Sequence, residues 1–147
     1  MENSKTWLLV ADSTSARLYS LHKAQIFQEP NPNRLELVSE FNHLNSRKKV
    51  NELVTDKEGR FGGRHFEGSS PKEHEAEVFA IELAKYMDGG RKEQHFRDLI
   101  VVAPPAFMGL LHKHMSKELT KSVSQQIEKD YTHQTEHELI RSLLTHF

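Results

Sequence analysis

Cysteine is absent from the 147 residues of this sequence. Disulfide bonds, a thiolate nucleophile and a cysteine-based zinc site are therefore excluded. Long apolar runs are absent as well, since none approaches the roughly 20 residues that a membrane-spanning helix needs. Residues 1–5 do not form the basic segment of an export signal, and no apolar stretch of signal length follows them. The sequence predicts a soluble, cytoplasmic protein.

An excess of charge of one sign is also lacking. The 20 Lys and Arg residues nearly balance the 21 Asp and Glu residues, and the formal net charge is −1. No global field would attract the protein to nucleic acid or to an anionic membrane, so any such binding must be local. A chain of this length suits one domain that buries roughly 70% of the surface of its unfolded form. We expect a single domain over residues 1–147.

Hydrophobic patterning predicts five strands and three helices in the order βββαβαβα. Apolar runs and period-two alternation indicate the strands, whereas i, i+3, i+4 spacing indicates the helices. The expected strands cover residues 7–11, 16–21, 35–41, 99–103 and 123–127, and the expected helices cover residues 71–87, 107–119 and 139–144. Three antiparallel strands followed by αβ crossovers are typical of an α/β, ribonuclease H-like mixed sheet.

The boundaries of the first long helix are suggested by residues that start and stop helices. Pro71 is suited to its first turn, with Ser69 or Ser70 as the N-cap. Asp88-Gly89-Gly90 is expected to end it. The first two strands are expected to form a hairpin, and the third is expected to pair antiparallel to the second.

Ribonuclease H-like nucleases hold two metal ions with carboxylates on the first strand, on the first helix and at the end of the fourth strand. Here Asp12 ends the first strand, and the first helix carries Glu73, Glu75 and Glu77. The fourth strand ends in Val102–Ala106, which offers no oxygen ligand, and Asp98 lies at its other end. The sequence therefore argues against nuclease activity. Asp12 is interpreted as a turn residue, and the glutamates as partners of the helix dipole.

The ten histidines do not combine into a recognisable metal motif. His133 and His137 have the i, i+4 spacing of one helix face, but no HExxH forms and spacing supplies no third ligand. Surface histidines are the preferred interpretation. A GxSxG elbow, a P-loop and a GxGxxG fingerprint are also missing. The sequence predicts no catalytic residue, no metal and no cofactor.

Periodicity disappears between residues 42 and 71, and a segment this long without predicted structure is unusual unless it is functional. Residues 42–72 contain seven Lys or Arg against four acidic residues. The tip combines cations, stacking rings and adjacent glycines: Lys57, Arg60, Phe61, Gly62, Gly63, Arg64 and His65. Such a tip suits single-stranded RNA. A solvated loop whose glycines merely turn corners is the open alternative.

Several motifs together resemble the bacterial family called "protein required for attachment to host cells". They are WLLVADSTSARLYSL at residues 7–21, DKEGR at 56–60, FAIEL at 79–83, LIVVAPPAFMG at 99–109 and KDYT at 129–132. The most specific motif residues are Asp12, Arg17, Pro104, Pro105, Gly109, Lys129 and Asp130. The resemblance implies a fold similar to the middle domain of archaeal and eukaryotic class-I peptide release factors and of Pelota.

In those release factors a Gly-Gly-Gln loop enters the peptidyl transferase centre. Gly62-Gly63-Arg64 has the same place in the order of elements here, and only the two glycines carry over. The arginine departs from the pattern, because a guanidinium only donates hydrogen bonds and cannot position an attacking water as an amide oxygen can. It can still bind an RNA phosphate.

The leading hypothesis is a nonenzymatic RNA- or ribosome-binding factor, related to the translation release and rescue factors, that binds a ribosome or tRNA through residues 57–66. One alternative is a protein-interaction factor in attachment to host cells. The other is peptidyl-tRNA hydrolysis through the backbone amides of Gly62 and Gly63. The oligomeric state stays open.

Overall fold

The computed structural model describes residues 5–43 and 71–146. Its strands are β1 (Thr6–Ala11), β2 (Ser15–Leu21), β3 (Glu36–Asn42), β4 (Asp98–Val102) and β5 (Val123–Ile127). Its helices are α1 (Lys23–Gln28), the 3-10 turn η1 (Pro32–Arg34), α4 (Pro71–Lys92), α5 (Pro105–His114), α6 (Lys117–Ser122) and α7 (Glu136–Leu144).

The five strands form one mixed sheet in the order β3-β2-β1-β4-β5. β1 and β2 make an antiparallel hairpin, and β2 pairs antiparallel with β3. β4 is parallel to β1 and to β5. All six residues of β1 are buried, as expected for a strand with neighbours on both sides and helices on both faces.

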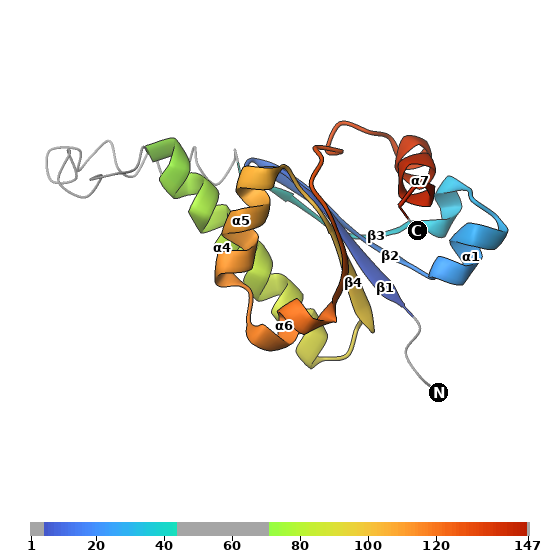
Figure 1. Cartoon of the computed structure of the whole chain (residues 1–147), viewed down its shortest axis with the longest axis horizontal. Coiled ribbons are helices and arrows are strands. Elements are labelled where there is room, and N and C mark those ends of the chain that lie inside the picture. Colours follow the sequence, from blue (N-terminus) through green and yellow to red (C-terminus); the bar gives the residue numbers. More distant parts are fainter. Residues whose placement is uncertain (1–4, 44–70, 147) are drawn as a thin grey trace, which may run out of the picture.

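Helices α4, α5 and α6 lie on one side of this sheet, and α1 and α7 lie on the other (Figure 1). Alternation along β1 divides its side chains between two hydrophobic clusters. Trp7 and Leu9 pack in the cluster with Phe79 of α4. Leu8 and Val10 pack in the opposite cluster with Ile140 of α7 and other side chains.

The structure confirms the main predictions for the fold. The chain is an α/β protein with a mixed sheet, and its first two strands form the expected hairpin. The third strand is antiparallel to the second, and β4 lies inside the sheet between β1 and β5. Helix α1 and η1, which lie between β2 and β3, were not predicted. None of the helices in the described part of the chain is long and apolar enough to cross a membrane.

The predicted end of the first long helix at Asp88-Gly89-Gly90 is wrong, because α4 continues to Lys92. Gly90 is buried against Trp7, and a Cβ atom at Gly90 would lie 2.4 Å from the Trp7 ring. This glycine therefore allows close packing and does not end the helix. Asp88 accepts hydrogen bonds from Arg91 and Ser116, which ties this last turn to the start of α6.

The predicted helix over 107–119 is also wrong in its continuity, since it divides into α5 and α6. Ser116 has extended backbone angles, and its side chain accepts a hydrogen bond from Leu119 N, which makes it the N-cap of α6. The apolar spacing persisted across the break because Leu111 and Leu119 belong to the same hydrophobic cluster.

Gly90→Ala should destabilise the fold by about 1–3 kcal/mol, because the new methyl group overlaps a buried indole ring. Gly89→Ala is the matched control. No atom lies within 4 Å of a Cβ at that neighbouring position, so alanine should stabilise α4 by roughly 0.5–1 kcal/mol. Urea unfolding measures both changes. Similar effects for the two variants would contradict the packing role of Gly90.

Candidate functional site

The carboxyl ends of β1, β4 and β5 meet at one edge of the sheet, because these three strands are parallel. Asp12 follows β1, Pro104 comes shortly after β4, and the Lys129–Thr132 segment comes shortly after β5. Ligands of open α/β sheets bind at this edge, at the point where neighbouring connections run to opposite faces. The VAD, APP and KDYT motifs, far apart in the sequence, therefore share one end of the sheet.

Asp12 is held tightly in the turn that joins β1 to β2. Its Oδ1 accepts hydrogen bonds from Thr14 N at 2.8 Å and from Ser15 N at 2.9 Å. Burial alone would raise the pKa of Asp12, but these backbone donors and the hydroxyls of Thr14 and Thr132 outweigh it and lower the pKa. Asp12 is thus a fixed carboxylate, in agreement with the turn role expected from the sequence.

Two further side chains of types that can coordinate metals, those of Asp130 and His133, lie beside Asp12. Thr132 Oγ1 lies 3.2 Å from Asp12 Oδ2 and 2.5 Å from Asp130 Oδ1, so one hydroxyl lies between two carboxylates. His133 joins them, and one ligand atom from each of Asp12, Asp130 and His133 lies within 4.8 Å of the others. Asp12 is half-buried, whereas Asp130 and His133 are exposed. The sequence analysis did not predict this cluster.

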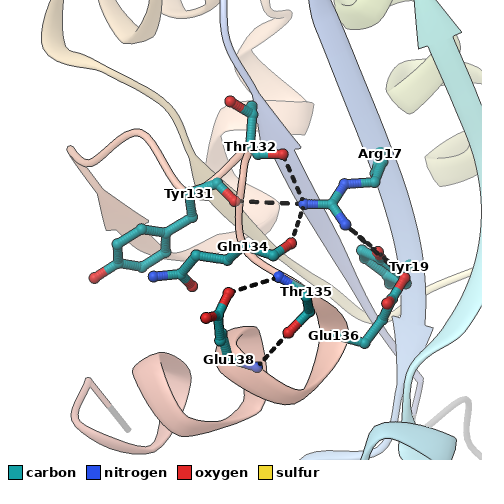
Figure 2. A network of polar contacts seen from close by, with 8 residues as sticks. All are labelled: Arg17, Tyr19, Tyr131, Thr132, Gln134, Thr135, Glu136 and Glu138. Atoms are coloured by element: carbon teal, nitrogen blue, oxygen red, sulfur yellow. Dashed lines mark hydrogen bonds and ion pairs between the residues drawn. The ribbon is translucent and has the colours of Figure 1, made fainter.

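Arg17 of β2 fixes the segment that carries these residues, as Figure 2 shows. Its Nη2 donates to the carbonyl oxygens of Gln134 at 2.9 Å, Thr132 at 3.1 Å and Tyr131 at 3.4 Å. Backbone carbonyls that converge on one charged donor make strong, directional contacts. The family-motif arginine therefore holds the β5–α7 connection against the hairpin.

Arg17 also connects to the start of α7 through Tyr19. Arg17 Nη1 donates to the Tyr19 hydroxyl at 2.9 Å, and that hydroxyl donates to Glu136 Oε2 at 2.7 Å (Figure 2). Burial and the hydrogen bond to Glu136 raise the pKa of Tyr19 above its ordinary value, so it stays protonated. Thr135 and Glu138 complete a capping box, and each side chain bonds to the other's backbone N–H.

The same edge holds both flanks of the 44–70 segment. His43 N donates to Thr14 O at 2.8 Å in the β1–β2 turn. The His43 ring is buried and stacks on Phe79 of α4, with a centroid separation of 5.0 Å. Its Nε2 lies 3.9 Å from Glu75 Oε1, one turn before Phe79. The residues on either side of this segment are therefore fixed to one another.

A pocket of about 430 Å³ lies beside the β1–β2 turn and the start of α4. Ser13 from the hairpin turn, Glu73 and His74 from α4, and Phe107 and Leu110 from α5 are among the residues that line it. Glu77, also on its wall, accepts from His114 at 2.7 Å and lies 2.8 Å from Lys113 Nζ. The hydrogen bonds from Lys113 and His114 lower the pKa of Glu77. Glu77 thus pairs with α5 through its Oε2 atom.

The remaining motif residues have separate positions. Pro104 is the N-cap of α5, and Pro105 begins the helix, where a missing N–H costs nothing. Gly109 lies exposed on α5, with no atom within 4 Å of a Cβ at that position. Lys129 is exposed beside Asp130. These residues do not form one site with Asp12.

The predicted RNA-binding tip lies outside the residues that the structure describes: Lys57, Arg60, Phe61, Gly62, Gly63, Arg64 and His65. Asp98 lies at the opposite end of the sheet from Asp12, as expected, because it pairs with Thr6 in the parallel register. The prediction that His133 and His137 share a helix face is wrong. Helix α7 begins at Glu136, and His133 belongs to the turn before it.

The chain is similar to one known protein family and to solved structures of archaeal proteins. A family model described as "Protein required for attachment to host cells" matches residues 7–143, which confirms the resemblance indicated by the motifs. No curated protein matches the chain. The crystal structure of an archaeal translation termination factor, aRF1, is similar with a TM-score of 0.50 and 12% identity, covering 98% of this chain and 39% of that chain. A structure described as an archaeal protein has a TM-score of 0.46 and 11% identity, covering 98% and 38%. The chain spans about two fifths of the length of these structures.

Arg17→Lys should destabilise the protein by about 1–3 kcal/mol, because an ammonium group does not reproduce the planar fork that reaches the carbonyls and Tyr19. Hydrogen exchange of the amides at 130–135 should accelerate. Arg141→Lys, at an exposed position on α7, is the control and should change neither measurement. Equal stability losses in the two variants would contradict the role given to Arg17.

Asp12→Asn should lose stability in a pH-dependent way. A carboxyl whose pKa is lowered on folding stabilises the protein above its unfolded pKa of about 3.9. This contribution is lost as the pH falls through the lower pKa of the folded state. The difference in unfolding free energy between wild type and variant should therefore be largest near neutral pH and shrink below about pH 4. Urea unfolding from pH 2 to 7 tests this, with the exposed Glu128→Gln as control. A difference that is constant over this range would contradict it.

Proposed function

The chain belongs to the family of proteins required for attachment to host cells, and we propose that it acts in the cytoplasm as a nonenzymatic RNA- or ribosome-binding factor. The proposal draws on the similarity of its fold to that of an archaeal translation termination factor. It also draws on the basic, glycine-containing 57–66 stretch. A ribosome or a tRNA is the proposed partner.

The observation that carries this proposal is a base, formed by Thr14, His43 and Phe79, that joins the residues before and after the basic segment. His43 precedes the segment and bonds to the β1–β2 turn, while its ring stacks on α4, the helix that follows the segment. Both flanks are therefore joined to the hydrophobic core through buried contacts. A contact surface presented from such a base loses less conformational entropy on binding than one whose flanks are independent.

The distribution of charge supports a contact through the basic segment rather than through the sheet edge that carries Asp12. The edge carries carboxylates at Asp12, Asp130 and Glu73, which repel phosphate. Residues 42–72 have a net excess of cations. Arginine binds phosphate oxygens in a bidentate way, and Phe61 and Phe66 provide faces on which unpaired bases stack.

The proposal is for a nonenzymatic factor because the chemistry of hydrolysis is incomplete. Arg64 stands where the release factors that this family resembles have glutamine, and a guanidinium has no acceptor for an attacking water. Within the described residues, the raised pKa of Tyr19 keeps it protonated and its hydroxyl donates to Glu136, so Tyr19 does not serve as a general base.

Co-sedimentation with 70S ribosomes and separated subunits over a salt series tests the proposal. We expect salt-sensitive binding to the large subunit, and Arg60→Ala/Arg64→Ala should weaken it. Loss of two phosphate contacts should reduce the slope of log affinity against log salt by roughly 1.4, the value for single strands. Arg97→Ala/Arg141→Ala removes the same charge from two exposed positions elsewhere and should bind as wild type does.

The controls decide how a negative result is read. Absence of binding to any particle and to tRNA at physiological salt would overturn the proposal. Equal weakening in both double variants would indicate a nonspecific effect of net charge and would also contradict the role of the 57–66 stretch.

A protein-interaction factor in attachment to host cells is the second candidate, favoured by the description of the family and by one surface. The edge strand β3 exposes Leu37 and Val38 beside a groove of about 480 Å³ that Trp7 and His95 also line. An exposed strand edge with apolar side chains is suited to pairing with another chain. Localisation at the cell surface after fractionation would favour this candidate over the first.

A further inference from the structure

We propose that Asp12, Asp130 and His133 form a binding site for a divalent transition-metal cation of the Zn²⁺ or Mn²⁺ type. One oxygen from each carboxylate and one ring nitrogen lie within 4.8 Å of each other. The inference is independent of the proposed binding to RNA, because it rests on the edge of the sheet and not on the 57–66 stretch.

The separation of the three ligand atoms suits one ion. An ion midway between three atoms that are 4.8 Å apart lies about 2.8 Å from each, and this is the upper limit for the group. Bonds from Zn²⁺ to imidazole nitrogen or carboxylate oxygen are about 2.0–2.2 Å long. Contraction by roughly half an ångström or more closes the site, and the exposed side chains of Asp130 and His133 have room to make it.

Asp12 supplies the fixed point of this site. Backbone N–H groups of Thr14 and Ser15 occupy its Oδ1, which orients the carboxylate and leaves Oδ2 directed at Thr132 and the cluster. Donors that hold a ligating carboxylate in this way pre-organise metal sites. The half-buried position of Asp12 further limits competition from bulk water.

One hydroxyl lies between the two carboxylates of the proposed site. Thr132 Oγ1 lies within hydrogen-bond distance of both Asp12 and Asp130, but a hydroxyl has one proton and donates to one of them at a time. Among the ion pairs of the described residues, none joins Lys or Arg to Asp12 or Asp130. The two carboxylates thus share one hydroxyl proton, and a divalent ion between them would attract both.

The mixed donor set selects the class of ion. Imidazole favours Zn²⁺ and its neighbours among the first-row metals, whereas Ca²⁺ and Mg²⁺ prefer sites made of oxygen alone. The nitrogen of His133 therefore distinguishes this group from an ordinary acidic surface cluster. Three protein ligands leave at least one coordination position open to water, as in zinc sites that bind a further ligand.

The site also explains why the chain brings these residues together from distant motifs. Asp12 follows β1, while Asp130 and His133 lie in the β5–α7 connection that Arg17 binds through the carbonyls of residues 131, 132 and 134. The ion pair that Arg17 makes among the described residues is with Glu136 and not with Asp12 or Asp130. In this arrangement Arg17 is a positioning residue for the metal ligands.

Titration calorimetry of the full chain, freed of any affinity tag and stripped with EDTA, tests the site with ZnCl₂ and with MnCl₂. We expect one ion per chain, and a loss of affinity of at least tenfold in both Asp130→Asn and His133→Asn. His137→Asn is the matched control, because His137 is exposed four residues away and belongs to no cluster of described ligands. Mn²⁺ should broaden amide NMR signals most at residues 12–15 and 130–134.

Three results would overturn the proposal. The first is absence of saturable binding at one ion per chain for both metals. The second is unchanged affinity in His133→Asn or Asp130→Asn, with folding verified by circular dichroism. The third is an equal loss in His137→Asn, which would indicate adventitious capture by surface histidines. Because co-sedimentation of the stripped protein with intact ribosomes, after removal of the EDTA, reports separately on the 57–66 stretch, failure of one proposal leaves the other standing.

Discussion

Burial of β1 on both faces is the constraint on which the other features depend. The apolar residues of this strand must have hydrophobic partners above or below the sheet, so Trp7 and Leu9 pack with α4, while Leu8 and Val10 pack with α7. β2 and β4 satisfy its backbone on either side. The chain leaves β1 at Asp12, at the carboxyl end of the strand. Because β4 and β5 run parallel to β1, their carboxyl ends lie at the same edge of the sheet. The polar residues of the edge are therefore arranged by apolar contacts behind them.

The sequence was sufficient for those parts of the fold that follow from local pattern. The β-branched run at Leu99–Ala103 predicted an interior strand, and the spacing after Pro71 predicted a long helix. The end of this helix was predicted wrongly because Gly90 is needed for packing against Trp7, a residue distant in sequence. Propensity treats a glycine pair as a stop, whereas tertiary packing can require the missing side chain inside a helix.

The sequence analysis did not predict the cluster of Asp12, Asp130 and His133, although it named these residues for other reasons. Asp12 and Asp130 were recognised as motif residues, but their proximity depends on a connection that returns across the end of β4. His133 was placed on a helix because its spacing to His137 fits one. Thr135 and Glu138 have the spacing of a capping box, and that signal would have started the helix after His133. The contacts of Arg17 with backbone carbonyls leave no sequence signal, because every residue has a carbonyl.

The contacts of Arg17 have a consequence for the order in which the protein matures. The carbonyl acceptors of its guanidinium lie 114–117 residues further along the chain. During synthesis the hairpin is made early, and it waits for its last polar partners until nearly the whole domain has left the ribosome. Contacts so distant in sequence also close late in folding, since chain entropy opposes them. The edge that carries Asp12 is therefore complete only when the whole domain has folded, and a partly synthesised chain lacks it.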